Sequence, residues 1–594
     1  MRLEQHVDSH LVSPPGRRLQ AVVSLSPKAS RAARGDDERG VQLSLPSERR
    51  LRNPVRVDAD QRLEIGRLGP PGRLPADASH EGQASRGGGG RPRAGRAAAQ
   101  RRMARRGFWR RQPRHDDRAR DHAGEHDENR NDEEGQTAPS SAMIAALRRR
   151  VVHGRLKMPQ PSRRSQLIPF SPIRTMFRLA DEMERAGGGP VFRLHVGDPD
   201  FAPPPVVVEA TAAALRAGKT HYAPTAGVQE LRTALAGKAR ARNGLAASTE
   251  QVIITPGSTQ ALFATLEILF GPGDDVLLPE IYWPNYVQET MLLGGRPIFY
   301  PLGPGYQPDV GALPQLVTPR TRAILINSPS NPTGAVFPEA TLRAFYELAR
   351  ERNLWILSDE AYEDFVFRGS HVSPGSFERD LPEEERRVFT LFTFSKSYAM
   401  TGLRLGCVVA PSLYTATLLR KCQEPLVASA GMPIQWGALP ALTETERAGV
   451  ARMKAAYQRR RDLALSILQP AGMADYVPEG AFYIMADVSE TGMTGDEFAV
   501  ALLREERVAV APGSGFAIQP RFTADGSPMA EPSPTGAPEY PTNPKARHRV
   551  RIAFCVSDEE LGEGLRRMVG FAERHRAGAE RPPAQRAVRR PAKA

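Results

Sequence analysis

The sequence predicts an α/β protein with a mainly parallel sheet, followed by a smaller α+β domain. From Leu194 to about Leu442, short apolar runs rich in β-branched residues alternate with segments of helical periodicity. This alternation is typical of a parallel sheet that helices cover on both faces. After Leu442 the pattern changes to one long amphipathic helix and three further strand-like runs, which indicates the second domain.

The distribution of charge separates this body from the two ends of the chain. The formal net charge is +14, but residues 1–157 hold 33 Lys and Arg against 20 Asp and Glu, so that 158–573 is mildly acidic. Residues 1–157 and 574–594 are basic and of low complexity, which predicts a disordered extension and a disordered tail. The extension could be an RNA-binding tail in which Trp109 stacks on a base. An unselected extension upstream of a start at Met143 or Met158 is the favoured interpretation, and no specific nucleic-acid partner is expected.

The cysteines and the apolar runs argue against a metal site, a disulfide-stabilised secreted protein and a membrane protein. Cys407, Cys422 and Cys555 are odd in number and lack metal-ligand spacing, which suits a reducing cytoplasm and predicts no metal site. No apolar run approaches the length of a membrane span, and the N-terminus has no signal core. We therefore expect a soluble cytoplasmic protein without a membrane partner.

The elements of the body follow in order along the chain. The strands of the large domain are predicted at 251–255, 274–280, 321–328, 354–360, 388–395 and 405–411, with helices at 259–270, 285–294 and 339–353. The small domain is predicted to contain a helix at 446–468 and strands at 480–488, 507–513 and 547–556. Ala517–Arg547 is rich in Pro, Gly and Ser and is expected to be a surface loop. The predicted domains are an arm with part of the small domain at 158–207, the large domain at 208–450 and the small domain at 451–573.

In a parallel sheet, ligands bind beyond the carboxyl ends of the strands. In "TPGSTQALF" a strand turns into a helix that begins near Ser258 and Thr259, and its free backbone N–H groups form an anion site. Taken alone this motif is weak evidence, because Ser and Thr cap many helices at which nothing binds.

A stronger signal comes from a lysine and an aspartate that each follow a strand. Asp359 ends an apolar run, where a carboxylate is costly unless it meets a cation such as a protonated pyridine nitrogen. Lys396 can condense with an aldehyde, and Thr393, Ser395 and Arg404 around it can bind a phosphate. An aldehyde, a pyridine nitrogen and a phosphate on one molecule describe pyridoxal 5′-phosphate.

The motifs "TPGSTQALF", "YWPNY", "NSPSNPTG", "SDEAYEDF" and "TFSKSYAMTGLRLG" together resemble the class I/II aminotransferases, the aspartate aminotransferase-like group of fold-type I pyridoxal-phosphate enzymes, over roughly residues 165–573. The resemblance implies that Lys396 is the Schiff-base lysine and proton shuttle and that Asp359 is the partner of the ring nitrogen. The other roles that it implies are Tyr362 and Asn331 at the 3′-oxygen, Trp283 stacked on the ring, Tyr222 reaching the phosphate of the neighbouring subunit, and Gly197, Asn331 and Arg551 at the substrate, with Arg551 clamping the α-carboxylate.

The role of Tyr222 implies a homodimer with shared active sites. Three departures from the family pattern concern the ligands. Thr393 stands where the family usually has Ser or Gly, and Thr259 stands where some bacterial aspartate enzymes have a lysine for the distal carboxylate. Another subgroup has an arginine for that carboxylate in the region from Arg420 to Arg447, where none lies between those two residues. We therefore expect neutral donors, aliphatic or aromatic, to outpace aspartate.

The sequence thus predicts a ping-pong aminotransferase that moves an amino group from an L-amino acid to a 2-oxo acid, with 2-oxoglutarate as the expected acceptor. A lyase or synthase on the same scaffold, which eliminates a β or γ group, is the alternative. A transcription regulator with an aminotransferase-like domain is less favoured, because residues 1–157 lack the helical pattern of a DNA-binding head.

Overall fold

The computed structural model of the 594-residue chain describes residues 159, 161–523, 526–530 and 538–576. The predicted extension, including Trp109, Met143 and Met158, lies outside the described residues, as does the tail from residue 577. Within the described part, no helix combines the length and the apolar character that crossing a membrane requires.

The larger sheet has seven strands in the order β2-β8-β7-β6-β5-β3-β4. All of its pairings are parallel except the two made by β8, so the sheet is mainly parallel, as the sequence predicts. The bounds of its strands are β2 Val252–Thr255, β3 Asp275–Pro279, β4 Arg296–Tyr300, β5 Thr321–Asn327, β6 Trp355–Asp359, β7 Val388–Thr393 and β8 Gly406–Val409.

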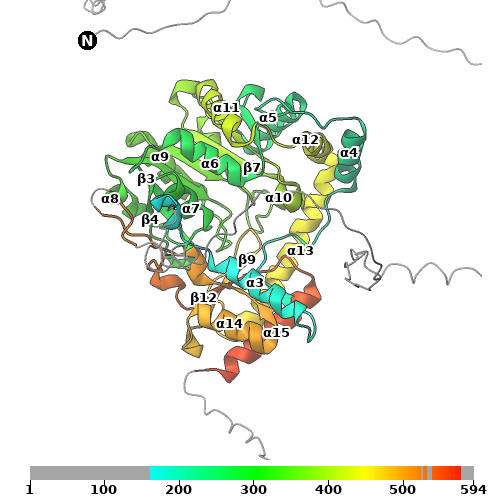
Figure 1. Cartoon of the computed structure of the whole chain (residues 1–594), viewed down its shortest axis with the longest axis vertical. Coiled ribbons are helices and arrows are strands. Elements are labelled where there is room, and N and C mark those ends of the chain that lie inside the picture. The colour runs from blue at the N-terminus through cyan, green and yellow to red at the C-terminus, as the bar shows by residue number, and fades with distance from the viewer. Residues whose placement is uncertain (1–158, 160, 524–525, 531–537, 577–594) are drawn as a thin grey trace, which may run out of the picture. The chain divides into compact units, whose positions relative to one another are not determined.

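Helices cover both faces of this sheet (Figure 1). Alternate residues of the central strands point to opposite faces: Ile324 and Ile356 pack in the cluster that includes α9, and Leu325 and Leu357 pack in the cluster that includes α6 and α7. The bounds of the helices in this half are α4 Pro205–Arg216, α5 Gln229–Asn243, α6 Ser258–Leu269, α7 Asn285–Leu292, α8 Leu313–Leu316, α9 Glu339–Glu351, α10 Phe394–Ser397, α11 Leu413–Val427 and α12 Met432–Ala438.

Strand β4 is the one strand of this sheet that the sequence analysis did not predict. It pairs only with β3, so it lies at the edge of the sheet, and it contains Pro297. A proline is tolerated in an edge strand because one side of that strand pairs with no neighbour, so the N–H group that proline lacks is not needed there. The same proline removes the sequence signal on which a strand prediction depends.

The second part of the body has a three-stranded antiparallel sheet, β11-β12-β9, and a short parallel pair, β1 with β10. Helix α14 contacts β12, and α15 contacts α14; Figure 1 shows both helices in this part of the chain. The predicted strand at 507–513 is divided into β10 and β11. The bounds are α2 Arg163–Gln166, α3 Pro172–Arg185, β1 Phe192–Arg193, α13 Glu444–Leu468, β9 Tyr483–Asp487, α14 Gly495–Glu506, β10 Val508–Ala509, β11 Ala511–Pro512, β12 Arg549–Ala553 and α15 Asp558–Arg574.

The predicted domain boundaries stay predictions, and three of them fall within helices, the first of them, at residue 207, within α4. Helix α13 begins before the proposed division at residue 450 and continues beyond it, and α15 ends one residue after the proposed end of the small domain. Helix α3 and strand β1, both from the N-terminal segment, contact α14, β10 and β11. The N-terminal segment therefore packs with elements that lie more than 300 residues later in the sequence.

The segment predicted as a surface loop, 517–547, contacts the large sheet in its described parts. The Tyr282 hydroxyl donates to the Ile518 carbonyl oxygen, and Asn543 Nδ2 donates to Glu280 Oε2 at 2.6 Å. The Tyr540 hydroxyl donates to the carbonyl oxygen of Leu167 at 2.8 Å. This segment is therefore fastened at the carboxyl end of β3 and beside the N-terminal segment, although its only described helix is one 3₁₀ turn, Pro544–Ala546.

Candidate functional site

A cavity of about 780 Å³ lies at the carboxyl edge of the parallel strands. Loops after β5 and β6, helix α10 and the starts of α6 and α7 form one side, which we call the sheet wall. The other side, the small-domain wall, comprises α3, the segment 195–198, β9 and β12. Every site residue predicted from the sequence lines this cavity except Tyr222, so the fold brings together residues from positions 197 to 551.

Lys396 lies on the short helix α10, directly after β7. Its Nζ donates to the carbonyl oxygen of Gly197 at 2.6 Å. Burial lowers the pKa of the Lys396 amine to about 8, the charge of Arg551 adds to this, and Asp198 opposes it. At pH 7 about a tenth of an amine with this pKa is unprotonated, far more than of an ordinary lysine, and this fraction can act as a nucleophile and as a proton acceptor.

The first turn of α6 and the loop around Arg404 form a cradle for an anion. Helix α6 has Gly257 at its N-cap, no side-chain cap and no acidic residue in its first turn, so its first N–H groups are free to bind a ligand. Arg404 Nη1 donates weakly to Ser395 Oγ at 3.4 Å, and the Thr393 hydroxyl donates to the same oxygen at 3.0 Å. A Cβ at Gly257 would lie 2.6 Å from Arg404 Nη2, so only glycine lets the guanidinium approach the helix.

Asp359, the last residue of β6, is buried on the sheet wall. The Tyr286 hydroxyl donates to Asp359 Oδ2 at 2.6 Å, and the Ala361 N–H donates to Oδ1 at 3.1 Å. Burial raises the pKa of Asp359, and these two hydrogen bonds oppose the rise. Tyr286 was missed by the sequence analysis, although it is the last letter of the motif "YWPNY" that the analysis quoted for Trp283.

The next residue, Glu360, is also buried, but its oxygens are already occupied. Oε1 accepts from two serine hydroxyls at 2.9 and 2.6 Å, and Oε2 pairs with His371 at 2.8 Å. Ligand atoms of Glu360, Glu363 and His371 lie within 4.8 Å of one another, which is a spacing compatible with a metal. Lys238 forms an ion pair with Glu363, and we therefore assign this cluster to the packing of the protein and not to a metal.

Arg551 on β12 is almost completely buried and has only neutral partners. Its Nη1 donates to Asn331 Oδ1 at 3.0 Å, its Nη2 donates to the His195 carbonyl oxygen at 2.6 Å, and its Nε has no partner within the described residues. Burial lowers the pKa of the guanidinium, and Tyr483 and Tyr362 oppose this. A buried cation of this kind is costly unless an anion joins it.

Tyr483, on β9, is a second residue that the sequence analysis missed. Its hydroxyl lies 2.9 Å from the hydroxyl of Tyr362, and its ring stacks under Arg551, whose Cζ is 4.4 Å from the ring centroid. A Cβ at Gly197 would lie 2.0 Å from the Tyr483 hydroxyl oxygen. Glycine at 197 therefore allows the N-terminal segment to pass across this tyrosine, which is a contact that no local sequence signal could reveal.

Trp283 and Tyr222 differ in their placement. Trp283 lines the cavity and packs edge-to-face against Tyr286, with the ring centroids 5.5 Å apart. Tyr222 is 86% exposed and does not line the cavity of its own chain.

The chemistry of the cavity fits pyridoxal phosphate. The start of α6 with Arg404 offers donors to a phosphate, Asp359 offers a carboxylate to a protonated ring nitrogen, and Lys396 offers an amine to an aldehyde. The roles of the individual residues stay predictions.

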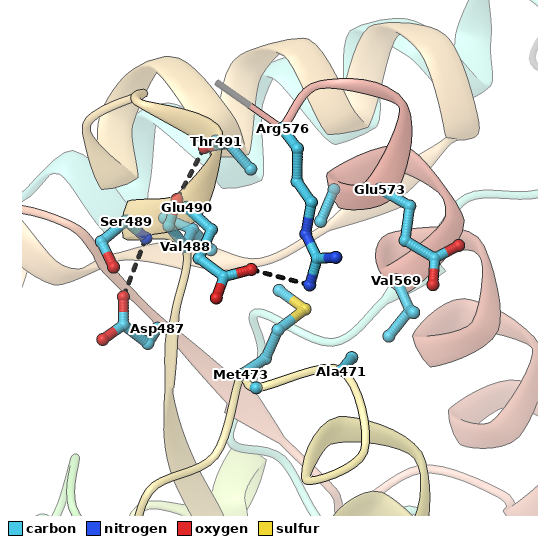
Figure 2. A pocket seen from close by; sticks show the side chains of 12 residues that line it. Ala471, Met473, Asp487, Val488, Ser489, Glu490, Thr491, Val569, Glu573 and Arg576 are labelled. Carbon is cyan, nitrogen blue, oxygen red and sulfur yellow. Dashed lines mark hydrogen bonds and ion pairs between the residues drawn. The ribbon is translucent and has the colours of Figure 1, made fainter. Parts of the chain in front are cut away.

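A second cavity, of about 170 Å³, lies among α15, β9 and the turn after α13 (Figure 2). Several of its charged side chains already have partners within the protein. Arg576 forms an ion pair with Glu490 at 2.7 Å, and the Asp487 carboxylate accepts a hydrogen bond from the Ser489 N–H at 2.8 Å. It contains none of the predicted site residues and offers no amine or catalytic pair. The larger cavity is therefore the candidate active site.

Comparison with known proteins agrees with this assignment. Residues 189–531 match the family described as Aminotransferase class I and II. A probable aspartate/prephenate aminotransferase of Aquifex aeolicus is 38% identical over 415 residues, which are 68% of this chain and 97% of that protein. The arginine–pyruvate transaminase of Pseudomonas aeruginosa is 39% identical over 384 residues, which are 64% of this chain and 90% of that protein. The solved structure of Thermus thermophilus aspartate aminotransferase with maleate has a TM-score of 0.62 and 35% identity, and the match covers 70% of this chain and all of that one.

Proposed function

The chain belongs to the class I and II aminotransferases, a family of pyridoxal-phosphate enzymes, and we propose that it moves the amino group of an L-amino acid to 2-oxoglutarate by a ping-pong mechanism. The fold and the transaminase activity follow from the family. The acceptor, the order of the two half-reactions and the residue roles below are our proposal. The observation that carries it is the pairing, in one cavity, of an amine whose pKa is about 8 with a buried arginine that has no anionic partner among the residues the structure describes.

We propose that the start of α6, Ser395 and Arg404 bind the phosphate and that Asp359 holds the ring nitrogen in its protonated form. When bound, pyridoxal phosphate takes up the amino group at its aldehyde and withdraws electrons through its ring. Tyr286 orients the Asp359 carboxylate by the hydrogen bond to Oδ2. Trp283 would offer its aromatic face to the ring, and Thr259 and Thr393 would add hydroxyl donors for the phosphate.

Arg551 of the small-domain wall and Asn331 of the sheet wall bind the α-carboxylate that every amino acid shares. The guanidinium can exchange its neutral partners for a carboxylate in a bidentate pair, which fixes the orientation of the Cα–H bond. Lys396 then accepts and returns the proton at Cα. The Gly197 carbonyl oxygen accepts a hydrogen bond from this amine, so Lys396 is directed into the cavity.

The choice of donor belongs to the proposal as well. The relatives' names cover an acidic donor and a basic donor, so the names alone do not select one. Our expectation from Thr259 and from the region after Arg420 is that neutral donors outpace aspartate. The three free cysteines suit a reducing compartment, and we propose a cytoplasmic enzyme of amino acid metabolism.

A test separates transamination from elimination. Holoenzyme reconstituted with pyridoxal phosphate should convert leucine, which has no leaving group, to its 2-oxo acid in the absence of an acceptor, with loss of the visible absorption of the cofactor. Addition of 2-oxoglutarate should restore that absorption and release glutamate. Failure of the first half-reaction, together with release of a β or γ substituent from a suitable amino acid, would establish the lyase alternative.

We further propose that Tyr222 contributes to the site of a second copy of this chain. Its side chain is 86% exposed, which is unusual for a tyrosine without a partner. Mixing the Tyr222→Ala and Lys396→Ala variants should restore part of the activity that each lacks, because a mixed dimer contains one site with both residues intact. Mixed dimers without any recovered activity would show that the sites are not shared.

A further inference from the structure

The small-domain wall contains an arginine that neither the sequence analysis nor the proposed roles use. Arg174 lies on α3, and it lines the cavity together with Phe170, Ile173 and Phe177. Phe170 precedes the helix; within it, Arg174 and Ile173 are three and four residues from Phe177, so these three side chains lie on one face. An adjoining side of α3 is fixed in the protein, since Met176 and Ala180 are buried in the core.

The guanidinium of Arg174 has no carboxylate partner within the part of the chain that the structure describes. Its Cζ lies 5.6 Å from the ring centroid of Phe177, and this ring contact is the interaction that the structure gives it. Arg178, one turn further along the same helix, forms an ion pair with Glu182 at 2.7 Å and does not line the cavity. The two arginines thus have similar exposure on one helix but different electrostatic environments.

A count of the charges that line the cavity leaves Arg174 without a function in the proposed reaction. The cationic side chains are Arg174, Lys396, Arg404 and Arg551, and the anionic ones are Asp198 and Asp359. Arg404 is accounted for by the phosphate, Arg551 by the α-carboxylate and Lys396 by the aldehyde. His195 does not add a cation, because burial lowers its pKa to about 3.

The proposed acceptor carries an anion that could pair with Arg174. 2-Oxoglutarate and glutamate each carry a second carboxylate at the far end of the side chain. We propose, on the premise of the transamination described above, that Arg174 binds this distal carboxylate and is the residue that admits acidic substrates to the site. An arginine is suited to this task, since its planar fork can make two parallel hydrogen bonds to a carboxylate while its face stays on Phe177.

This assignment explains how an enzyme that lacks a lysine at position 259 can still use 2-oxoglutarate. It also modifies the expectation about donors: neutral side chains would contact the apolar part of the same face, Ile173 and Phe177, and acidic ones would add the pair with Arg174. Specificity for acidic substrates therefore comes from the N-terminal segment, and not from the two positions where the sequence analysis looked for it.

The experiment compares Arg174→Met with the matched control Arg178→Met in the reconstituted holoenzyme. For Arg174→Met we expect kcat/KM for glutamate in the first half-reaction to fall about 10- to 100-fold, the effect of losing a charge-assisted hydrogen bond, while the value for leucine changes less than about threefold. Arg178→Met should leave both values unchanged. Spectral titration with maleate, a dicarboxylate that cannot react, should show a similar loss of affinity only for Arg174→Met, with binding of propionate unaltered.

Three results would overturn the inference. They are an equal loss for glutamate and leucine, unchanged maleate binding by Arg174→Met, or a wild-type enzyme that transaminates leucine but neither glutamate nor 2-oxoglutarate. These differ from a failure of the proposed function, in which the wild-type holoenzyme would transaminate neither leucine nor glutamate.

Discussion

The sheet wall and the small-domain wall of the cavity differ in how their charged groups are satisfied. On the sheet wall, Asp359 accepts hydrogen bonds from Tyr286 and from the Ala361 N–H, so both of its oxygens have donors before any ligand binds. On the small-domain wall, and among the described residues, the buried Arg551 has only neutral acceptors and the exposed Arg174 has only an aromatic ring.

This difference indicates which half of the site is complete in the ligand-free chain. A buried charge with its own hydrogen-bond partners is tolerated, whereas a buried cation without an anion remains costly until the anion arrives. We therefore infer that the sheet wall binds the cofactor, which stays in the site. The small-domain wall binds the carboxylates of substrates, which enter and leave in each turnover. Changes on the sheet wall should affect all substrates alike, and changes on the other wall should reveal which carboxylate each residue binds.

The largest effect is expected for Lys396→Ala. Loss of the amine removes both the covalent link to pyridoxal phosphate and the proton acceptor, so turnover should fall by about 10⁴-fold or more with every amino donor. Asp359 and the phosphate cradle should still retain the cofactor without a covalent bond. Borohydride treatment followed by mass spectrometry measures the link, and Lys421→Ala, a change at an exposed lysine of α11, is the control. A reducible link that persists in Lys396→Ala would assign the anchor to another lysine.

Arg551→Met tests the small-domain wall directly. We expect kcat/KM to fall roughly 100- to 1000-fold and by the same factor for all amino acids, because the α-carboxylate is common to them. The ligand-free variant should be at least as stable as the wild type in thermal unfolding, since a buried cation without an anion has been removed. Arg549→Met, two residues earlier on β12, is the matched control, because Arg549 already pairs with Asp475 at 2.9 Å. A loss that depends on the donor, or a strongly destabilised protein, would contradict this role.

Tyr286→Phe tests the hydrogen bond that completes the sheet wall. Burial raises the pKa of Asp359 and the Tyr286 hydroxyl opposes this, so removing the hydroxyl should raise the pKa further. The ionised carboxylate would then be lost at a higher pH, and the acidic limb of the pH–rate profile should move upward for all donors. Tyr300→Phe is a control, because the Tyr300 hydroxyl donates to the Leu325 carbonyl and not to Asp359. An unshifted acidic limb would show that Tyr286 serves packing alone.

The smallest effect is expected for Gly197→Ala, at the junction of the two walls. The added Cβ would lie 2.0 Å from the Tyr483 hydroxyl, so the N-terminal segment must move away from β9. We expect a loss of about 1–3 kcal/mol in the free energy of unfolding, typical of overpacking, with a moderate rise in KM. Denaturant unfolding measures the first quantity. The double variant Gly197→Ala with Tyr483→Phe should recover part of the stability, and no recovery would place the strain elsewhere.

Much of the sheet wall could be predicted from the sequence because its residues are local. Ser258, Asp359 and Lys396 each follow a run that is recognisable as a strand, and the carboxyl ends of parallel strands meet at one edge. Tyr286 belongs to the same wall and was still missed, because its partner is 73 residues away in the sequence. Strand β4 was missed because an edge strand tolerates the proline that weakens its signal.

The small-domain wall could be predicted only in part. Arg551 and Gly197 were found through the resemblance to a family, and their contacts were not. Arg174 gave no signal, since an arginine on an amphipathic helix is expected to face solvent. The segment 517–547 looked like a free loop because its composition is that of a loop, whereas its fastening to Glu280 and Leu167 depends on hydrogen bonds to distant residues.

By itself, the sequence determined the class of fold, the alternation of strands and helices, and the identity of the groups that follow each strand. Hydrophobic periodicity and the chemistry of single residues act over a few neighbouring positions, so they can be read from the chain directly. The tertiary structure alone decided that α3 turns Arg174 into the cavity, that Tyr483 passes under Arg551 and beside Gly197, and that Tyr286 completes Asp359. Those relations join residues that are tens to hundreds of positions apart, and the packing of whole elements, which no local pattern encodes, fixes them.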